Sequence, residues 1–242
     1  MELYLSQLVL EVTRRCNMAC DHCMRGDAQS IDMPAVVIDR VLDAVQGHGI
    51  GSVTFTGGEP VLNVPVIQYF VEQVQSREIG VGSFFVVTNG KVESLPLMHA
   101  LINLYAICDE PELCGLVVSS DRYHESVPQP KLYSALKFFN AEGHGPASEE
   151  YIIRSGRAHV NGIGKRKYRE RAESWDFEKE LGQDLYVCVN NTLHISSNGN
   201  VMPGCDFSYR RIDREHVGNV LRESLKDIIA RQVELNKLKE AA

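Results

Sequence analysis

Three cysteines lie within eight residues of this chain, in the stretch CNMACDHC at residues 16–23. Cys16, Cys20 and Cys23 have the spacing C-x3-C-x2-C, so their thiols can converge on one metal centre. A structural zinc site or a complete four-cysteine iron–sulfur site needs a fourth ligand, and the next cysteine in the sequence is Cys108. The spacing therefore favours a [4Fe–4S] cluster in which one iron is free to bind a small molecule.

The motif follows an apolar run that ends at Val12, and His22 stands directly before the last cysteine. In both respects it resembles the cluster motif of the radical S-adenosylmethionine (radical SAM) superfamily. The resemblance implies that the free iron binds S-adenosylmethionine and that the reduced cluster cleaves it to a 5′-deoxyadenosyl radical, which abstracts a hydrogen atom from the substrate. It also implies an electron donor such as flavodoxin or ferredoxin. The competing interpretation is a zinc- or iron–sulfur-binding module with a structural or sensing role.

Length and composition narrow the classes of protein to which the chain can belong. The chain has 242 residues, 44% of them hydrophobic, which suffices for one large domain with a small appendage. Its net charge of −7 argues against general binding of nucleic acid through phosphate contacts. No apolar stretch is long enough to span a bilayer, and the first residues lack the basic start of a signal peptide. We therefore expect a cytoplasmic protein without a membrane partner, whose cysteines are metal ligands or buried thiols.

Strand-like and helix-like segments alternate through residue 154. Apolar and β-branched patterns predict strands at residues 7–13, 52–56, 83–88, 116–119 and 151–154, and helices at residues 34–46, 64–77, 95–108 and 131–141. Such repetition is typical of a parallel sheet with right-handed crossovers. The predicted fold is α/β, a partial parallel (β/α)6 TIM-like barrel of about six strands.

The pattern changes beyond residue 155. A β-hairpin around an Asn-Gly turn is predicted at residues 185–195 and 200–202, and a closing helix at residues 224–239. We expect these elements to form a small cap. A domain boundary near residue 180 then separates a partial barrel at residues 1–180 from an extension at residues 181–242.

Polar residues follow the predicted strands, and the carboxyl ends of parallel strands are where ligand groups gather. Gly57 and Gly58 let the backbone approach a ligand closely, the carboxylate of Glu59 can accept hydrogen bonds from an ammonium group, and Pro60 stiffens the exit. This GGEP stretch resembles the radical SAM segment that binds the methionyl amino group of the cofactor. By the same resemblance, the further cofactor-binding candidates are His22, Thr88, Asn89, Ser119, Asp121 and Arg154. Arg157 competes with Arg154, and the sequence does not decide between them.

Tyr123 and His124, which follow the fourth predicted strand, are candidate catalytic residues. Tyr123 could return a hydrogen atom near the radical, and His124 could move a proton near neutral pH. A surface cluster at the start of a helix is the alternative interpretation. Further along, the run GIGKRK at residues 162–167 could hold a phosphate through backbone N–H groups and lysines, or could be a solvated linker.

The stretch from Cys188 to Cys205, followed by VGNVL at residues 217–221, resembles the start of the SPASM or twitch extension of radical SAM enzymes. The resemblance implies a second iron–sulfur cluster, with Cys188 and Cys205 as candidate ligands, or a cap that only shapes the pocket. Because no cysteine follows Cys205, the candidates for its other ligands are Cys108, Cys114, Asp206 and His216.

Two substrate classes remain open from the sequence. The SPASM-like tail favours a peptide, because that branch of the superfamily often modifies peptides or activates enzymes. The basic glycine run at residues 162–167 favours instead an anionic small molecule such as a nucleotide or sugar phosphate.

Overall fold

The computed structural model describes residues 2–128, 130–140, 148–165, 177–179 and 186–240. β1 (Glu2–Thr13) is central to the sheet, because β2 (Ile50–Gly57) and β7 (Tyr186–Ile195) both pair with it in parallel. The parallel order continues beyond β2 with β3 (Val81–Thr88), β4 (Gly115–Val118) and β5 (Phe139–Asn140). Antiparallel pairing begins at β7, whose neighbours are β6 (Phe177–Lys179) and β8 (Asn200–Pro203), and β8 pairs with β9 (Gly218–Asn219). The result is an open, partial barrel of mostly parallel strands.

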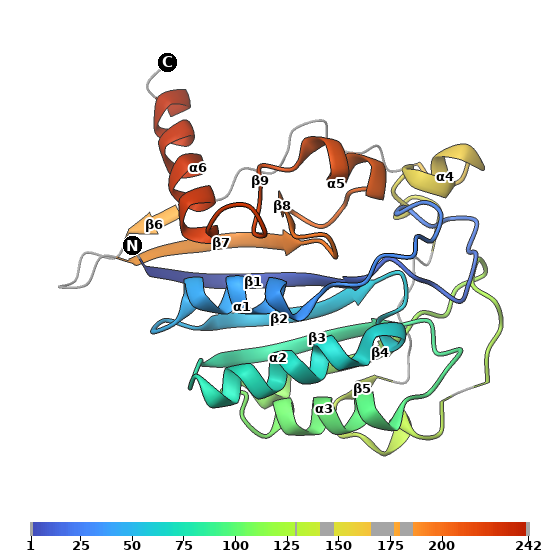
Figure 1. Cartoon of the computed structure of the whole chain (residues 1–242). Coiled ribbons are helices and arrows are strands. Elements are labelled where there is room, and N and C mark those ends of the chain that lie inside the picture. Colours follow the sequence, from blue (N-terminus) through green and yellow to red (C-terminus); the bar gives the residue numbers. More distant parts are fainter. Residues whose placement is uncertain (1, 129, 141–147, 166–176, 180–185, 241–242) are drawn as a thin grey trace.

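Three helices, α1 (Ala35–Val45), α2 (Val64–Ser76) and α3 (Leu95–Tyr105), lie along one face of the sheet (Figure 1). Alternate residues of β1, Leu8, Leu10 and Val12, belong to the hydrophobic core with them and are fully buried. This alternation is the expected one for a strand whose side chains point to opposite faces in turn. The core also includes Ile228 and Ile229 of α6 (Leu225–Glu240), so the closing helix is anchored on the same face.

The opposite face of β1 is linked to α5 (Tyr209–Glu215) by a buried arginine. Arg14 donates hydrogen bonds to Oε1 of Glu11 at 2.9 Å and to both carboxylate oxygens of Asp213 at 2.8 and 2.9 Å. Its guanidinium also lies 4.7 Å from the ring centre of Tyr209. Arg14 therefore holds the carboxyl-terminal extension against the end of the first strand.

The link between Arg14 and Asp213 predicts a loss of stability in acid. Burial alone would raise the pKa of the Asp213 carboxyl, but the hydrogen bonds and charge of Arg14 outweigh it and hold that pKa below its ordinary value. A lowered carboxyl pKa stabilises the fold above the unfolded-state pKa, and this contribution is lost as the pH falls through the lowered value. Asp213→Asn should therefore lower the urea midpoint at pH 7, and its difference from the unsubstituted protein should shrink between about pH 5 and pH 2.

The matched control is Glu72→Gln, because Glu72 is an exposed residue of α2. A difference for Asp213→Asn that stayed constant across this pH range would contradict the account.

Most predicted elements are confirmed. The alternation of strands and helices from β1 to β4 has the expected order. β1 begins five residues before the predicted start at residue 7, and the other ends lie within three residues of the predicted ones. β7 and β8 form the predicted hairpin, with Gly199 in the left-handed region at a φ of 82°. α6 also lies where a closing helix is expected, and the hydroxyl of Ser224 accepts a hydrogen bond from the backbone N–H of Asp227 at its start.

The predicted helix at residues 131–141 is wrong. The segment forms a 3₁₀ turn at Tyr133–Ala135 and then β5. The carboxylate of Glu93 accepts hydrogen bonds from the backbone N–H groups of residues 131–133, and the Tyr133 hydroxyl accepts one from the N–H of Ser94. These bonds to the loop before α3 satisfy the backbone without a helix, so tertiary contacts outweigh the local pattern.

The predicted strand at residues 151–154 is wrong as well. The N–H groups of Tyr151 and Ile152 bond to the carbonyl oxygens of Ser148 and Glu149, which makes a turn. A short helix, α4 (Gly156–Val160), follows this turn. The additional parallel strand that the fold needs is β7, on the other side of β1.

The proposed boundary at residue 180 lies outside the described residues. β7 pairs directly with β1, so the extension and the barrel share one sheet. In the described part of the chain, no helix has the length and apolar character that crossing a membrane requires.

Candidate functional site

The three motif cysteines surround one pocket in the loop that follows β1. Gly58 of the GGEP stretch and two residues from later in the chain share this pocket. Its lining consists of Cys16, Met18, Ala19, Cys20, Cys23, Gly26, Ala28, Gly58, Arg157 and Tyr209. The structure thus brings together the cysteine loop, the end of β2, α4 and the carboxyl-terminal extension.

The spacing of the thiols fits a cluster better than a zinc ion. Tetrahedral Zn–S bonds hold sulfur atoms about 3.8 Å apart. Among the described residues, Cys16, Cys20 and Cys23 do not form a group whose ligand atoms all lie within 4.8 Å of one another. An iron–sulfur cube accommodates cysteine sulfurs that are farther apart, because each binds a different iron. The residues present therefore fit a [4Fe–4S] cluster with three cysteine ligands.

Burial also sets the protonation of these thiols. Burial, together with the neighbouring thiols, raises the pKa of Cys20 to about 11, and burial raises the pKa of Cys16. In the metal-free protein these two groups are therefore protonated near neutral pH. Because thiolates are the metal ligands, cluster assembly has to release protons.

The GGEP stretch packs directly against the cysteine loop. The N–H of Gly58 donates to the carbonyl of Thr13, and the N–H of Glu59 donates to the carbonyl of Arg15, both at 2.8 Å. A Cβ atom at position 58 would lie 2.2 Å from the carbonyl oxygen of Arg15. Only glycine allows this approach, which explains why the sequence has a glycine where the end of β2 meets the pocket.

The Glu59 carboxylate is buried and bound by the protein. Its Oε1 accepts hydrogen bonds from the Thr88 hydroxyl at 2.8 Å and the Val61 N–H at 3.1 Å, and its Oε2 accepts one from the Asn89 N–H at 2.7 Å. Burial raises the pKa of this carboxyl, although the three hydrogen bonds oppose the shift. Glu59 thus joins the ends of β2 and β3. Of the GGEP stretch, Gly58 is the residue that lines the pocket.

Replacing Glu59 by glutamine should destabilise the protein. An amide has one acceptor oxygen, so its NH2 group would face either the Val61 N–H or the Asn89 N–H, and one buried donor would lose its partner. We expect the free energy of unfolding to fall by about 2 kcal/mol, measured by urea denaturation. Glu72→Gln, at an exposed position of α2, should change it by less than about 0.5 kcal/mol. Equal effects of the two substitutions would show that the Glu59 hydrogen bonds are not stabilising.

Asn89 contacts the cysteine loop, which the sequence did not reveal. Its side-chain Nδ2 donates to Oδ1 of Asn17 at 2.7 Å and lies 3.9 Å from Sγ of Cys16. The strand pattern indicated only that Asn89 follows β3. Its sulfur contact depends on how the two loops meet, which sequence spacing does not specify.

Of the two competing arginines, Arg157 lies in the pocket. The N–H of Arg157, in α4, donates to the carbonyl of Cys23 at 2.9 Å, and the guanidinium lies 3.5 Å from Asp21 and 3.6 Å from Asp27. Arg154 is exposed and is absent from the pocket lining. Since no strand forms at residues 151–154, the sequence argument that placed Arg154 at a strand end fails.

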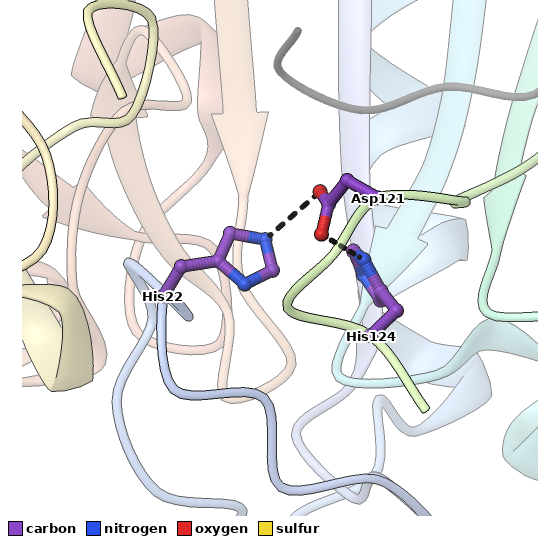
Figure 2. A group of neighbouring side chains, drawn as sticks. All are labelled: His22, Asp121 and His124. Atoms are coloured by element: carbon purple, nitrogen blue, oxygen red, sulfur yellow. Dashed lines mark ion pairs between the residues drawn. The ribbon is translucent and has the colours of Figure 1, made fainter. Parts of the chain in front are cut away.

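A second polar group lies beside the cysteine loop (Figure 2). Nε2 of His22 is 3.5 Å from Oδ2 of Asp121, and Nδ1 of His124 is 2.9 Å from Oδ1 of the same carboxylate. Burial lowers the pKa of His22, with Asp121 opposing the shift. Tyr123, between Asp121 and His124, stacks near His22 with ring centres 5.1 Å apart, and its hydroxyl donates to Glu149 at 2.9 Å. Ser119 is tied to β3 through its N–H, which bonds to the carbonyl of Thr88 at 2.8 Å.

The structure does not bring the other four cysteines to one place. Sγ of Cys188 donates to Oδ1 of Asn190 at 2.9 Å, whereas Cys205 contacts its neighbour Asp206. Cys108 hydrogen-bonds Cys114 between α3 and β4, at the amino-terminal edge of the sheet. In the described part of the chain, no group of three metal ligands includes any of these four cysteines. The ligands of a second cluster therefore stay a prediction.

Comparison with known proteins agrees with this site. A model described as the radical SAM superfamily matches residues 10–105, and a SPASM model, described as an iron–sulfur cluster-binding domain, matches residues 188–242. GTP 3′,8-cyclase of Chlorobaculum tepidum is 31% identical over 83 residues, which are 34% of this chain and 24% of that protein. The same enzyme of Streptomyces coelicolor is 38% identical over 79 residues, or 30% of this chain and 23% of that protein. The chain spans about a quarter of the length of these curated relatives.

Among solved structures, native anSMEcpe with bound AdoMet and the Cp18Cys peptide has a similar fold. The TM-score is 0.53 at 15% identity, and the match covers 93% of this chain and 80% of the other. This likeness concerns the fold alone. The radical SAM match implies a [4Fe–4S] cluster and S-adenosylmethionine as cofactors of the barrel. The SPASM match implies iron–sulfur binding by the extension. The chain thus contains a radical SAM domain, whose match includes the three cysteines of the pocket at the end of β1, and a SPASM-type carboxyl-terminal extension.

Proposed function

We propose that this chain generates a substrate radical and that its substrate is a peptide. The observation that carries the first part is the pocket in which Cys16, Cys20 and Cys23 meet Gly58. A [4Fe–4S] cluster held there by these cysteines would supply the electron for cleavage of S-adenosylmethionine to a radical that takes a hydrogen atom from the substrate.

The protein's own residues bind and shield these groups. Cys16, Cys20 and Cys23 would each bind one iron of the cluster, and Gly58 and Arg157 line the same pocket. Arg157 is the residue proposed to meet the cofactor carboxylate, because a guanidinium suits bidentate carboxylate binding. Glu59 has a positioning role, because its hydrogen bonds to Thr88 and Asn89 hold the loops after β2 and β3 in place.

The choice of a peptide rests on the extension. Tyr209 of α5 is the pocket residue that comes from the SPASM-type segment, so this segment shapes the reaction site. In the superfamily, extensions that this segment resembles often accompany peptide substrates. A nucleotide is the second candidate, favoured by the similarity to GTP 3′,8-cyclases over about a third of the chain.

The test compares the two substrate classes in one assay. The reconstituted, reduced enzyme is given S-adenosylmethionine with either pools of synthetic peptides or nucleoside triphosphates including GTP, and 5′-deoxyadenosine is quantified. We expect peptide pools to raise the yield and to contain a product of changed mass. Stimulation by a nucleoside triphosphate alone, with a modified nucleotide as product, would refute the peptide proposal in favour of the second candidate.

A further inference from the structure

We propose that His22, Asp121 and His124 form a binding site for a divalent first-row transition cation, separate from the cluster. One ligand atom from each of these residues belongs to a group in which all the atoms lie within 4.8 Å of one another. Figure 2 shows the two imidazole rings on either side of the carboxylate. None of the three residues lines the cysteine pocket.

The separations between ligand atoms suit one metal ion. Nε2 of His22 lies 3.5 Å from Oδ2 of Asp121, Nδ1 of His124 lies 2.9 Å from the other carboxylate oxygen, Oδ1, and a set with one ligand atom from each residue lies within 4.8 Å. Ligands at about 2.1 Å from a cation are about 3.0 to 3.4 Å apart in octahedral or tetrahedral geometry. Two imidazoles and one carboxylate are a donor set that zinc, iron, manganese and cobalt share.

Buried polar atoms of the group form no hydrogen bonds that would account for their burial. Nδ1 of His124 and Oδ2 of Asp121 are buried and form no hydrogen bond with any residue in the described ranges. The short distance between His124 and Asp121 is therefore a contact without hydrogen-bond geometry. Oδ1 of Asp121 is engaged instead by the backbone N–H of Tyr123 at 2.8 Å. Buried polar atoms without partners are costly, and a cation would satisfy them.

The site connects two loops that are far apart in sequence. His22 belongs to the cysteine loop after β1, and Asp121 and His124 belong to the loop after β4. The side chains of the group are largely shielded from water, with exposed fractions of 7% for Asp121 and 14% for each histidine. Three protein ligands leave at least one coordination position for water or an oxygen or nitrogen atom of a bound molecule.

The test measures zinc binding to the protein with its cluster loaded. The enzyme is reconstituted anaerobically and dialysed against buffered Zn²⁺, and iron and zinc are counted in the same sample. We expect one zinc per chain at unchanged iron content. The zinc K-edge absorption spectrum should show nitrogen and oxygen neighbours without sulfur, which separates this site from zinc bound by the cysteines.

Two variants and one control locate the zinc. Asp121→Asn keeps the acceptor for the Tyr123 N–H but replaces the other carboxylate oxygen, and His124→Ala removes one ligand that belongs to the loop after β4 and packs against the ring of His22 at 4.8 Å between ring centres. Each should weaken zinc binding at least about tenfold, while His99→Ala, at an exposed position of α3, should leave it unchanged.

Three results would overturn the site: zinc with sulfur neighbours, zinc affinity equal in all variants, or no zinc bound at unchanged iron content. Affinity for S-adenosylmethionine is measured on the same variants. If Asp121→Asn weakens only the binding of S-adenosylmethionine and not that of zinc, Asp121 is a cofactor contact, as the family resemblance implies, and the metal site is overturned. Because iron content and 5′-deoxyadenosine formation are followed independently, failure of this site leaves the proposed radical function separately testable.

Discussion

Replacing Cys16, Cys20 or Cys23 singly by alanine should remove most iron from the reconstituted protein. All three sulfurs border the same pocket, and a cube with one ligand fewer exposes a second iron to solvent and chelators. We expect iron to fall from about four atoms per chain to below about one for the barrel cluster, with loss of the brown absorbance. Iron is measured colorimetrically after anaerobic desalting.

The matched control for this experiment is Cys108→Ala. Cys108 lies at the amino-terminal edge of the sheet, where it bonds to Cys114, whereas the cluster loop follows the carboxyl end of β1. The control should keep its iron. Full iron content in all three motif variants would contradict the assignment of the pocket.

Replacing Arg14 by methionine should strongly destabilise the fold. The side chains of Arg14 and Glu11 are both fully buried, and the substitution would leave the Glu11 carboxylate without its cation. His194, whose Nε2 lies 3.9 Å from Oε2 of Glu11, cannot readily replace it, because complete burial lowers the pKa of His194 well below its ordinary value. We expect the free energy of unfolding to fall by about 3 kcal/mol.

The measurement is urea denaturation at pH 7 beside Arg40→Met, a change at an exposed position of α1. The control should shift the free energy of unfolding by less than about 0.5 kcal/mol. If Arg14→Met were as stable as the control, the buried bridge between β1 and α5 would not be what holds the extension in place.

The sequence predicts well what depends on local pattern. Apolar alternation and β-branched runs identified β2 and β3, and the cysteine spacing together with GGEP identified the two loops that form the pocket. Parallel topology then predicts that residues after successive strands meet, as Glu59, Thr88 and Asn89 do.

What the sequence misses depends on long-range contacts. Nothing local shows that Glu93 would bind the backbone of residues 131–133 and so prevent a helix. The positions of Tyr209 and Arg157 in the pocket follow from how the extension and α4 pack against the cysteine loop. The pairing of β7 with β1 across the chain is likewise a property of the whole sheet.

The most direct test of the account is formation of 5′-deoxyadenosine. The protein is reconstituted anaerobically with iron and sulfide, reduced, and given S-adenosylmethionine, beside a variant in which Cys16, Cys20 and Cys23 are all alanine. The account predicts 5′-deoxyadenosine from the intact protein and none above background from the variant. A fully loaded, reduced cluster that forms no 5′-deoxyadenosine, or equal amounts from both proteins, would contradict it.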